Sequence, residues 1–223
     1  MPSLETIQCA AERLGLVARG VLALSPAERL GPLAEARSLA LFGMVGAVNW
    51  PAFAASPEFA DAAPHPLDRW SRRLIGVLAD DLGGVAVFPF DGPPYWPFPR
   101  WAQRADSVWP SPLGLLVHAE YGLWHSYRGA LAFAEDLYAP AREAERSPCE
   151  GCREKPCLAA CPVAAFSGGG YDVEACAALL HVRRGGECMT RGCLARRACP
   201  VGREHAHGAG QAVFHMQAFL ASR

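Results

Sequence analysis

The chain has 223 residues, of which 51% are hydrophobic, and a formal net charge of −1 at pH 7. That length suits one domain of ordinary size plus a small one, and the near-neutral charge predicts no nucleic-acid partner. The sequence has no apolar run near the roughly 20 residues that cross a bilayer and no charged-then-apolar leader. We therefore expect a cytoplasmic protein with no membrane partner.

Apolar periodicity before residue 140 predicts helices alternating with strands. Helical spacing extends over residues 4–14 and 67–82, and short helices are expected at 26–30 and 100–105. The pair Gly83-Gly84 predicts the end of the second long helix. Strands are expected at 16–24, 39–48 and 85–90, a loop at 49–66, and a strand pair of 113–118 with 123–133 around a turn at 120–122. This order is typical of an α+β layer fold.

Aromatic residues gather in and after a proline-rich stretch: Tyr95, Trp96, Phe98, Trp101 and Trp109. They either wall a pocket for a large flat ligand or fill the core against the sheet. Cys9 lies far from the other cysteines on an apolar helical stretch, and it is expected in the core.

Eight cysteines fall in the last third of the chain and carry the strongest chemical signal. The first four read Cys149-x2-Cys152-x4-Cys157-x3-Cys161-Pro162, and the next four are Cys176, Cys188, Cys193 and Cys199, with Pro200 after the last. Thiolates bind soft iron, and a four-iron cluster needs four of them. The pattern favours two iron–sulfur clusters. Structural zinc and disulfides are alternatives, although disulfides require an oxidising compartment.

Two groups of four, each closed by Cys-Pro, resemble the two-cluster bacterial ferredoxins. In that family the fourth cysteine of each run binds the other cluster. The resemblance therefore implies one [4Fe-4S] cluster on Cys149, Cys152, Cys157 and Cys199, and a second on Cys161, Cys176, Cys188 and Cys193. The spacing departs from the family at Cys152-x4-Cys157 and throughout the second group.

A second resemblance covers about 20 residues, 113–131. This stretch is similar to a segment of CblC-type cobalamin-processing proteins. In that segment a strand ends in a histidine, the chain turns at an aromatic-Gly pair, and the returning strand contains Trp and an Arg-Gly pair. That family has a nitroreductase-like fold and binds base-off cobalamin over this segment. The resemblance implies corrinoid contacts from His118, Tyr121, Gly122, Trp124 and Arg128. For His118 a satisfied strand-end histidine is the alternative, and for Arg128 a neighbouring carboxylate.

The whole layout resembles epoxyqueuosine reductases and reductive dehalogenases. These join a nitroreductase-like corrinoid-binding domain to a two-cluster module, with a lone cysteine early in a helix, here Cys176. The implied domains are a mixed α/β domain at 1–140, a ferredoxin-like module at 147–207 and a C-terminal helix at 208–223 that packs on the body. Residues 142–148 form the expected linker. Epoxyqueuosine reductases also carry a motif ending in Asp-Tyr-His, which this sequence lacks.

We therefore expect an iron–sulfur protein that binds and reduces cobalamin, with removal of its upper axial ligand as one form of that activity. A cobalamin-dependent reductase of an organic substrate and a non-enzymatic, ferredoxin-like electron carrier are the alternatives. A basic run near the second cysteine group is either a solvated face or a docking site for an acidic electron donor, of flavodoxin or ferredoxin type. The run comprises Arg183, Arg184, Arg191, Arg196, Arg197 and Arg203. His205 and His207 are expected to have no special role.

Overall fold

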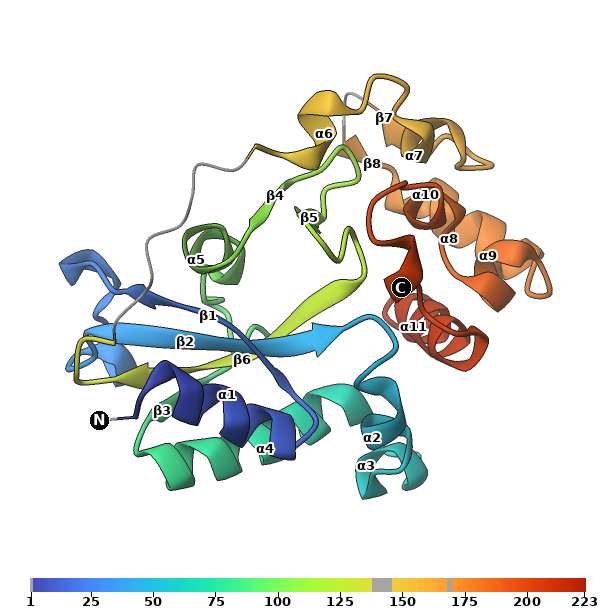
Figure 1. Ribbon diagram of the computed structural model, residues 1–223. Helices are drawn as coiled ribbons and strands as arrows, with labels where there is room; N and C mark the ends of the chain where they lie inside the picture. The colour runs from blue at the N-terminus through green and yellow to red at the C-terminus, as the bar shows by residue number, and fades with distance from the viewer. Residues whose placement is uncertain (1, 138–145, 168–169) are drawn as a thin grey trace. The chain divides into compact units, whose positions relative to one another are not determined.

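The computed structural model describes residues 2–137, 146–167 and 170–223. Its contacts divide the chain into two units (Figure 1). The first unit is Met1–Ser107 with Ser126–Ala144, and the second is Val108–His125 with Glu145–Arg223. Most of the predicted linker, 142–148, lies outside the described residues.

The first unit is built on a four-stranded sheet in the order β1-β2-β6-β3. The strands are β1 (Val17–Ala23), β2 (Ser38–Val45), β3 (Val85–Val87) and β6 (His125–Phe133). β1 runs antiparallel to β2, and β3 runs antiparallel to β6. Every residue of β2 is buried, which explains why the sequence shows a continuous apolar run there instead of alternation.

Helices cover both faces of this sheet. In Figure 1, α1 (Leu4–Arg13) and α4 (Pro66–Leu82) lie side by side on one face, and α5 (Phe98–Ala105) lies on the other. Gly83 ends α4 in the left-handed conformation, as the sequence predicted. α5 approaches β1 so closely that a Cβ on Gly20 would lie 2.1 Å from the Ala105 carbonyl oxygen. Only glycine fits at that position.

Short helical turns fill the connections of the first unit: η1 (Pro26–Glu28), η2 (Gly31–Leu33), α2 (Trp50–Ala54) and α3 (Pro57–Ala60). The last two occupy half of the predicted loop at 49–66. Trp101 of α5 donates its indole N–H to Glu28 at 2.8 Å, and Arg104 pairs with the same carboxylate. Burial raises the pKa of Glu28, but hydrogen bonds from Ser25, Arg104 and Trp101 outweigh it and lower the pKa to about 2.

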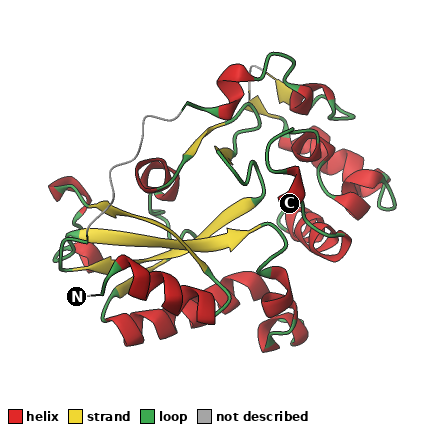
Figure 2. Cartoon of the chain, in the orientation of Figure 1, coloured by secondary structure: helices red, strands yellow, loops and turns green. Residues whose placement is uncertain are grey.

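The second unit consists mainly of short helices and loops (Figure 2). Its helices are α6 (Pro148–Gly151), α7 (Pro156–Ala159), α8 (Val173–Val182), α9 (Glu187–Arg191), α10 (Leu194–Arg197), η3 (Arg203–His205) and α11 (Ala209–Ala221). Its strands form two pairs, β4 (Val108–Pro110) with β5 (Leu116–His118), and β7 (Phe166–Ser167) with β8 (Gly170–Tyr171).

The predicted pairing of 113–118 with 123–133 is wrong. β5 pairs with β4, while β6 joins the four-stranded sheet, and a single bridge connects His118 with Gly122. The two residues of that bridge exchange backbone hydrogen bonds of 2.7 and 3.2 Å, which closes the turn after only one pair. Gly122 has φ +55°, so the turn uses a left-handed glycine.

The division between units also differs from the predicted boundary at residue 140. Residues 108–125 belong with the cysteines because Leu113, Val117 and Leu123 share an apolar cluster with Ala195 and Cys199. The C-terminal helix α11, predicted to pack on the body, packs on α9 and α8 within this second unit. None of the described helices is long and apolar enough to span a bilayer.

Candidate functional site

The structure gathers four of the eight predicted cysteine ligands around one small hollow. Cys149, Cys152, Cys157 and Cys199 line it together with apolar residues of β5 and its neighbours. Burial, and next the charge of Cys199, raises the pKa of the Cys149 and Cys157 thiols. Thiols held in the protonated form release protons when a metal binds them, so loading of this group is coupled to pH.

The other four cysteines also lie near one another. Burial is the main cause that raises the pKa of Cys188 and Cys193. The thiolate charges of Cys176 and Cys161 also raise the pKa of Cys188. The thiolate charges of Cys188 and Cys176 do the same for the pKa of Cys193. The neighbours in space are therefore Cys161, Cys176, Cys188 and Cys193. The fourth cysteine of each run lies with the opposite run, the grouping that the ferredoxin resemblance implies.

Local backbone structure explains how the irregular spacing is accommodated. Lys155 adopts a left-handed conformation with φ +41°, and Pro156 then begins α7. This turn takes up the two additional residues between Cys152 and Cys157. Backbone N–H groups also reach the sulfurs: that of Ala165 donates to Cys161 Sγ at 3.3 Å. Hydrogen bonds to sulfur tune the reduction potential of a bound cluster.

Among the described residues, no group of three or more His, Cys, Asp or Glu side chains is close enough to hold a single metal ion. Structural zinc and a four-iron cluster both bind through four thiolates, and metal and sulfide analysis distinguishes them.

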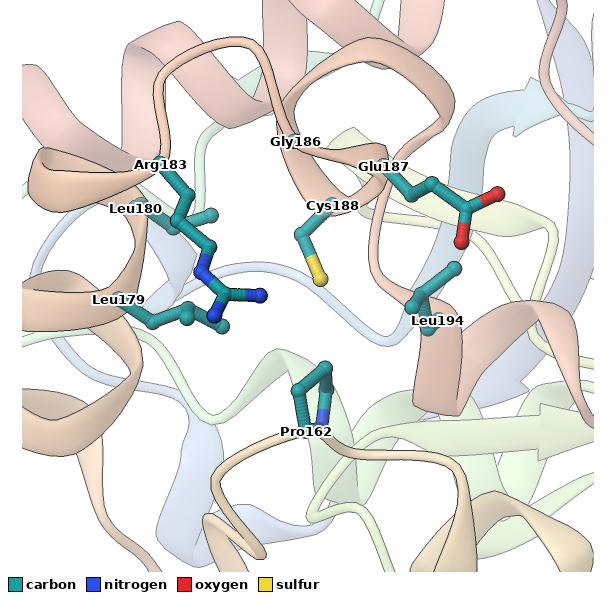
Figure 3. A pocket seen from close by; sticks show the side chains of 8 residues that line it. All are labelled: Pro162, Leu179, Leu180, Arg183, Gly186, Glu187, Cys188 and Leu194. Carbon is teal, nitrogen blue, oxygen red and sulfur yellow. The ribbon is translucent and has the colours of Figure 1, made fainter.

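A hollow of about 150 Å³ lies beside Cys188, and Figure 3 shows the side chains that line it. The Cys188 sulfur and the Arg183 guanidinium both reach into it, and Pro162, Leu179 and Leu194 form apolar walls. Arg183, Arg184 and the neighbouring Val182 are exposed, and Val182 retains 84% of its accessible surface. The second cysteine group therefore lies near a surface that combines positive charge with an exposed apolar side chain.

Four of the five predicted corrinoid contacts lie in the second unit, and they are engaged in packing there. The His118 ring stacks on Tyr121 at 4.3 Å, and its Nδ1 accepts N–H groups of Glu120 and Tyr121. A Cβ on Gly122 would lie 2.0 Å from the Val201 carbonyl oxygen. Trp124 is only 4% exposed. Arg196 lies over its ring, and His207 meets it edge-on.

The fifth, Arg128, lies in the first unit. Its guanidinium donates to Ser71 Oγ at 2.9 Å and pairs with Asp68. The neighbouring carboxylate that the sequence left open is therefore present. These five residues therefore pack against protein neighbours, although the buried indole N–H of Trp124 has no hydrogen-bond partner in the described structure. Their contacts with a corrin ring stay a prediction.

The aromatic stretch splits in the same way. Phe98 and Trp101 are buried in the first unit, with Trp96 stacked on Trp101 at 5.9 Å, while Tyr95 is 66% exposed. Trp109 lies in the second unit and lines an open hollow of about 490 Å³ beside Cys149. Phe98 and Trp101 therefore fill the core of the first unit.

The expectation for Cys9 is wrong, because its side chain is exposed on α1. The apolar face of α1 is instead formed by Ile7, Ala10 and Ala11. Sequence reasoning also missed the surroundings of Trp124. Arg196, assigned to a basic run, and His207, expected to have no special role, contact it from α10 and from the segment before α11. The signal available for Arg196 was its position midway between the predicted ligands Cys193 and Cys199.

Three solved structures of epoxyqueuosine reductases share this fold. A selenomethionine-labelled epoxyqueuosine reductase matches with a TM-score of 0.57 and 15% identity, over 93% of this chain and 68% of the other. The enzyme from Streptococcus thermophilus matches with a TM-score of 0.53 and 17% identity, over 91% and 66%. An epoxyqueuosine reductase with an epoxyqueuosine-modified tRNA-Tyr stem loop matches with a TM-score of 0.52 and 15% identity, over 92% and 66%.

These likenesses confirm the mixed α+β fold and the epoxyqueuosine reductase-like part of the resemblance. The chain spans about two thirds of each enzyme. At this level of identity the likeness shows the fold alone. No family model matches the sequence, and no curated protein matches it.

Proposed function

We propose that the protein is an iron–sulfur oxidoreductase that carries single electrons through two four-iron clusters to a corrinoid-dependent reduction. One cluster is held by Cys149, Cys152, Cys157 and Cys199, and the other by Cys161, Cys176, Cys188 and Cys193. The observation that carries the proposal is the sorting of eight cysteines into two spatial groups of four, with the last cysteine of each run, Cys161 and Cys199, lying in the opposite group.

The residues around each group suit this role. Clusters, when bound, supply one-electron transfer at potentials set by charge, hydrogen bonds and solvent exposure. The chain provides thiols of raised pKa that a metal deprotonates, and a backbone N–H directed at Cys161 Sγ. Apolar residues such as Val117 and Leu123 pack beside Cys199 and exclude water from its surroundings.

Reduction of an organic substrate is favoured over removal of a ligand from the corrinoid itself. The fold likeness to enzymes described as epoxyqueuosine reductases supports this choice. The corrinoid itself is supported by the resemblance and the fold, and we assign none of its contacts to His118, Tyr121, Gly122, Trp124 or Arg128. Because the sequence lacks the Asp-Tyr-His motif of epoxyqueuosine reductases, tRNA is not proposed as the substrate.

The electron donor is an acidic one-electron carrier of flavodoxin or ferredoxin type that docks beside Cys188. Exposed Arg183 and Arg184 supply the positive charge, and Val182 supplies an apolar contact at the centre. Such charges steer an oppositely charged partner and raise its association rate.

Anaerobic protein with reconstituted clusters tests the proposal when it is reduced with limiting dithionite and mixed with hydroxocobalamin. We expect the visible spectrum to change to that of base-off, reduced corrinoid while the clusters are reoxidised. Metal-free protein treated identically is the control. Cluster formation with an unchanged corrinoid spectrum would reject the corrinoid and leave the electron-carrier function. Zinc without acid-labile sulfide would reject both.

A further inference from the structure

Arg196 on α10 is a cation that no carboxylate pairs with in the described part of the chain. Its Nε donates to the Leu123 carbonyl oxygen at 2.9 Å, and a second guanidinium nitrogen donates to the same oxygen. The guanidinium carbon lies 4.5 Å from the centroid of the Trp124 ring. Two hydrogen bonds to one carbonyl and a stack on a buried indole fix its position and direction.

Within the described residues, no carboxylate compensates the charge of Arg196. Burial, followed by the charges of Arg196 and His215, lowers the pKa of His207 to about 2, so this imidazole is neutral. Burial lowers the pKa of Arg196 to about 10, which still leaves the guanidinium charged at neutral pH. The thiol of Cys193 lies close enough to interact with this charge, and the Arg196 backbone N–H donates to the Cys193 sulfur.

A charge withdrawn from water is costly unless an opposite charge compensates it. Arg196 lies three positions after Cys193 and three before Cys199, one cysteine from each group. A four-iron cluster with four thiolate ligands carries net negative charge, and that charge contributes to its potential. The group that can compensate Arg196 is therefore the cluster.

We propose that Arg196 is the built-in counter-charge of the cluster that includes Cys193, and that it raises the reduction potential of that cluster. Reduction adds a negative charge, and a fixed cation nearby stabilises the reduced form. Trp124 and the Leu123 carbonyl act as positioning groups for the guanidinium. The inference rests on the proposed function, because it requires clusters on the cysteines.

The test compares variants of the full chain with reconstituted clusters. Iron and sulfide content is measured first, and both midpoint potentials are then determined by redox titration followed by electron paramagnetic resonance. Arg196→Gln and Arg196→Met remove the charge, and Arg196→Lys retains it. Arg197→Gln is the matched control, since it removes the same charge one residue away, where the half-buried Arg197 donates to the Arg191 carbonyl.

We expect each neutral Arg196 variant to make reduction of one cluster about tenfold less favourable, a fall of about 59 mV for a one-electron couple. Arg196→Lys and Arg197→Gln should stay close to the parent protein. If Arg196→Lys binds its clusters but Arg196→Gln and Arg196→Met do not, the inference is also supported, because a positive charge at this position is then required for cluster binding. Equal potentials in Arg196→Gln and Arg197→Gln would overturn it, as would failure of all three Arg196 variants to load. Absence of clusters in the parent protein would instead reject the proposed function.

Discussion

Gly122→Ala tests whether the segment 108–125 is an integral part of the cysteine-bearing unit. Gly122 has φ +55°, and a Cβ there would lie 2.0 Å from the Val201 carbonyl oxygen. An L-residue pays about 1–2 kcal/mol in the left-handed conformation, and overpacking adds about 1–3 kcal/mol. The clash is with backbone that follows Cys199-Pro200 directly, so it cannot be relieved by a side-chain rotation. We expect a total cost of about 2–5 kcal/mol.

Gly114→Ala provides the matched control. Gly114 lies in the same segment with φ +72°, but a Cβ added there would have nothing within 4 Å. This substitution should therefore cost only the conformational term, about 1–2 kcal/mol.

The assay is anaerobic thermal melting of the cluster-loaded protein, followed by visible cluster absorbance and by circular dichroism. For a unit of this size, 1 kcal/mol shifts the midpoint by about 4–8 °C. Gly122→Ala should melt about 4–24 °C below Gly114→Ala in both signals, because the two variants differ by the overpacking cost alone. Equal melting of the two variants would refute the close approach between Gly122 and Val201 and the assignment of 108–125 to this unit.

The remaining predictions concern the cysteines, an acid-sensitive contact and the donor surface. Cys157→Ser should lose one of the two clusters, about half of the iron by metal analysis, whereas Cys9→Ser should lose none. Because the pKa of Glu28 is lowered from 4.5 to about 2, its contribution to stability is complete above pH 4.5 and is lost as the pH falls towards 2. The melting temperature of metal-free Glu28→Gln should therefore change less between those pH values than that of the metal-free parent protein. An identical pH dependence of the two melting temperatures would contradict the assignment. The double charge reversal Arg183→Glu with Arg184→Glu should slow cluster reduction by reduced flavodoxin about tenfold at low salt and leave reduction by dithionite unchanged. Equal slowing with both reductants would place the effect in the cluster instead of the docking surface.

Local sequence signals predicted the first unit well where one element decides its own structure. The apolar run of 39–48 contains most of β2, and the periodicity of 67–82 with its terminal glycines gives α4 almost to the residue. Such signals work because a helix buried on one face shows apolar residues at helical spacing, and a strand buried on both faces shows a continuous apolar run.

Pairings between distant segments were not predictable in this way. The apolar strand at 125–133 suits either a hairpin with 113–118 or the central sheet, and its partners β2 and β3 are remote in sequence. The same holds for Trp124 and Arg196, which lie 72 positions apart and meet only in the folded unit. A tryptophan covered by a guanidinium and a tryptophan facing a flat cofactor look the same in the sequence.

The cysteines were the part of the site that sequence reasoning described best. Their order and the two Cys-Pro pairs implied two interleaved groups, and the structure brings together the same sets of four. The corrinoid contacts depended on orientation, which spacing does not encode, and those five residues are occupied by other partners in the fold.

Iron and acid-labile sulfide analysis of anaerobically prepared protein tests the central claim most directly. Two four-iron clusters require about eight iron and eight sulfide per chain. Cys199→Ser and Cys161→Ser, tested in parallel, should each reduce both values by about half, because these are the cysteines exchanged between the runs. Zinc in place of iron, or iron without sulfide, would contradict the account.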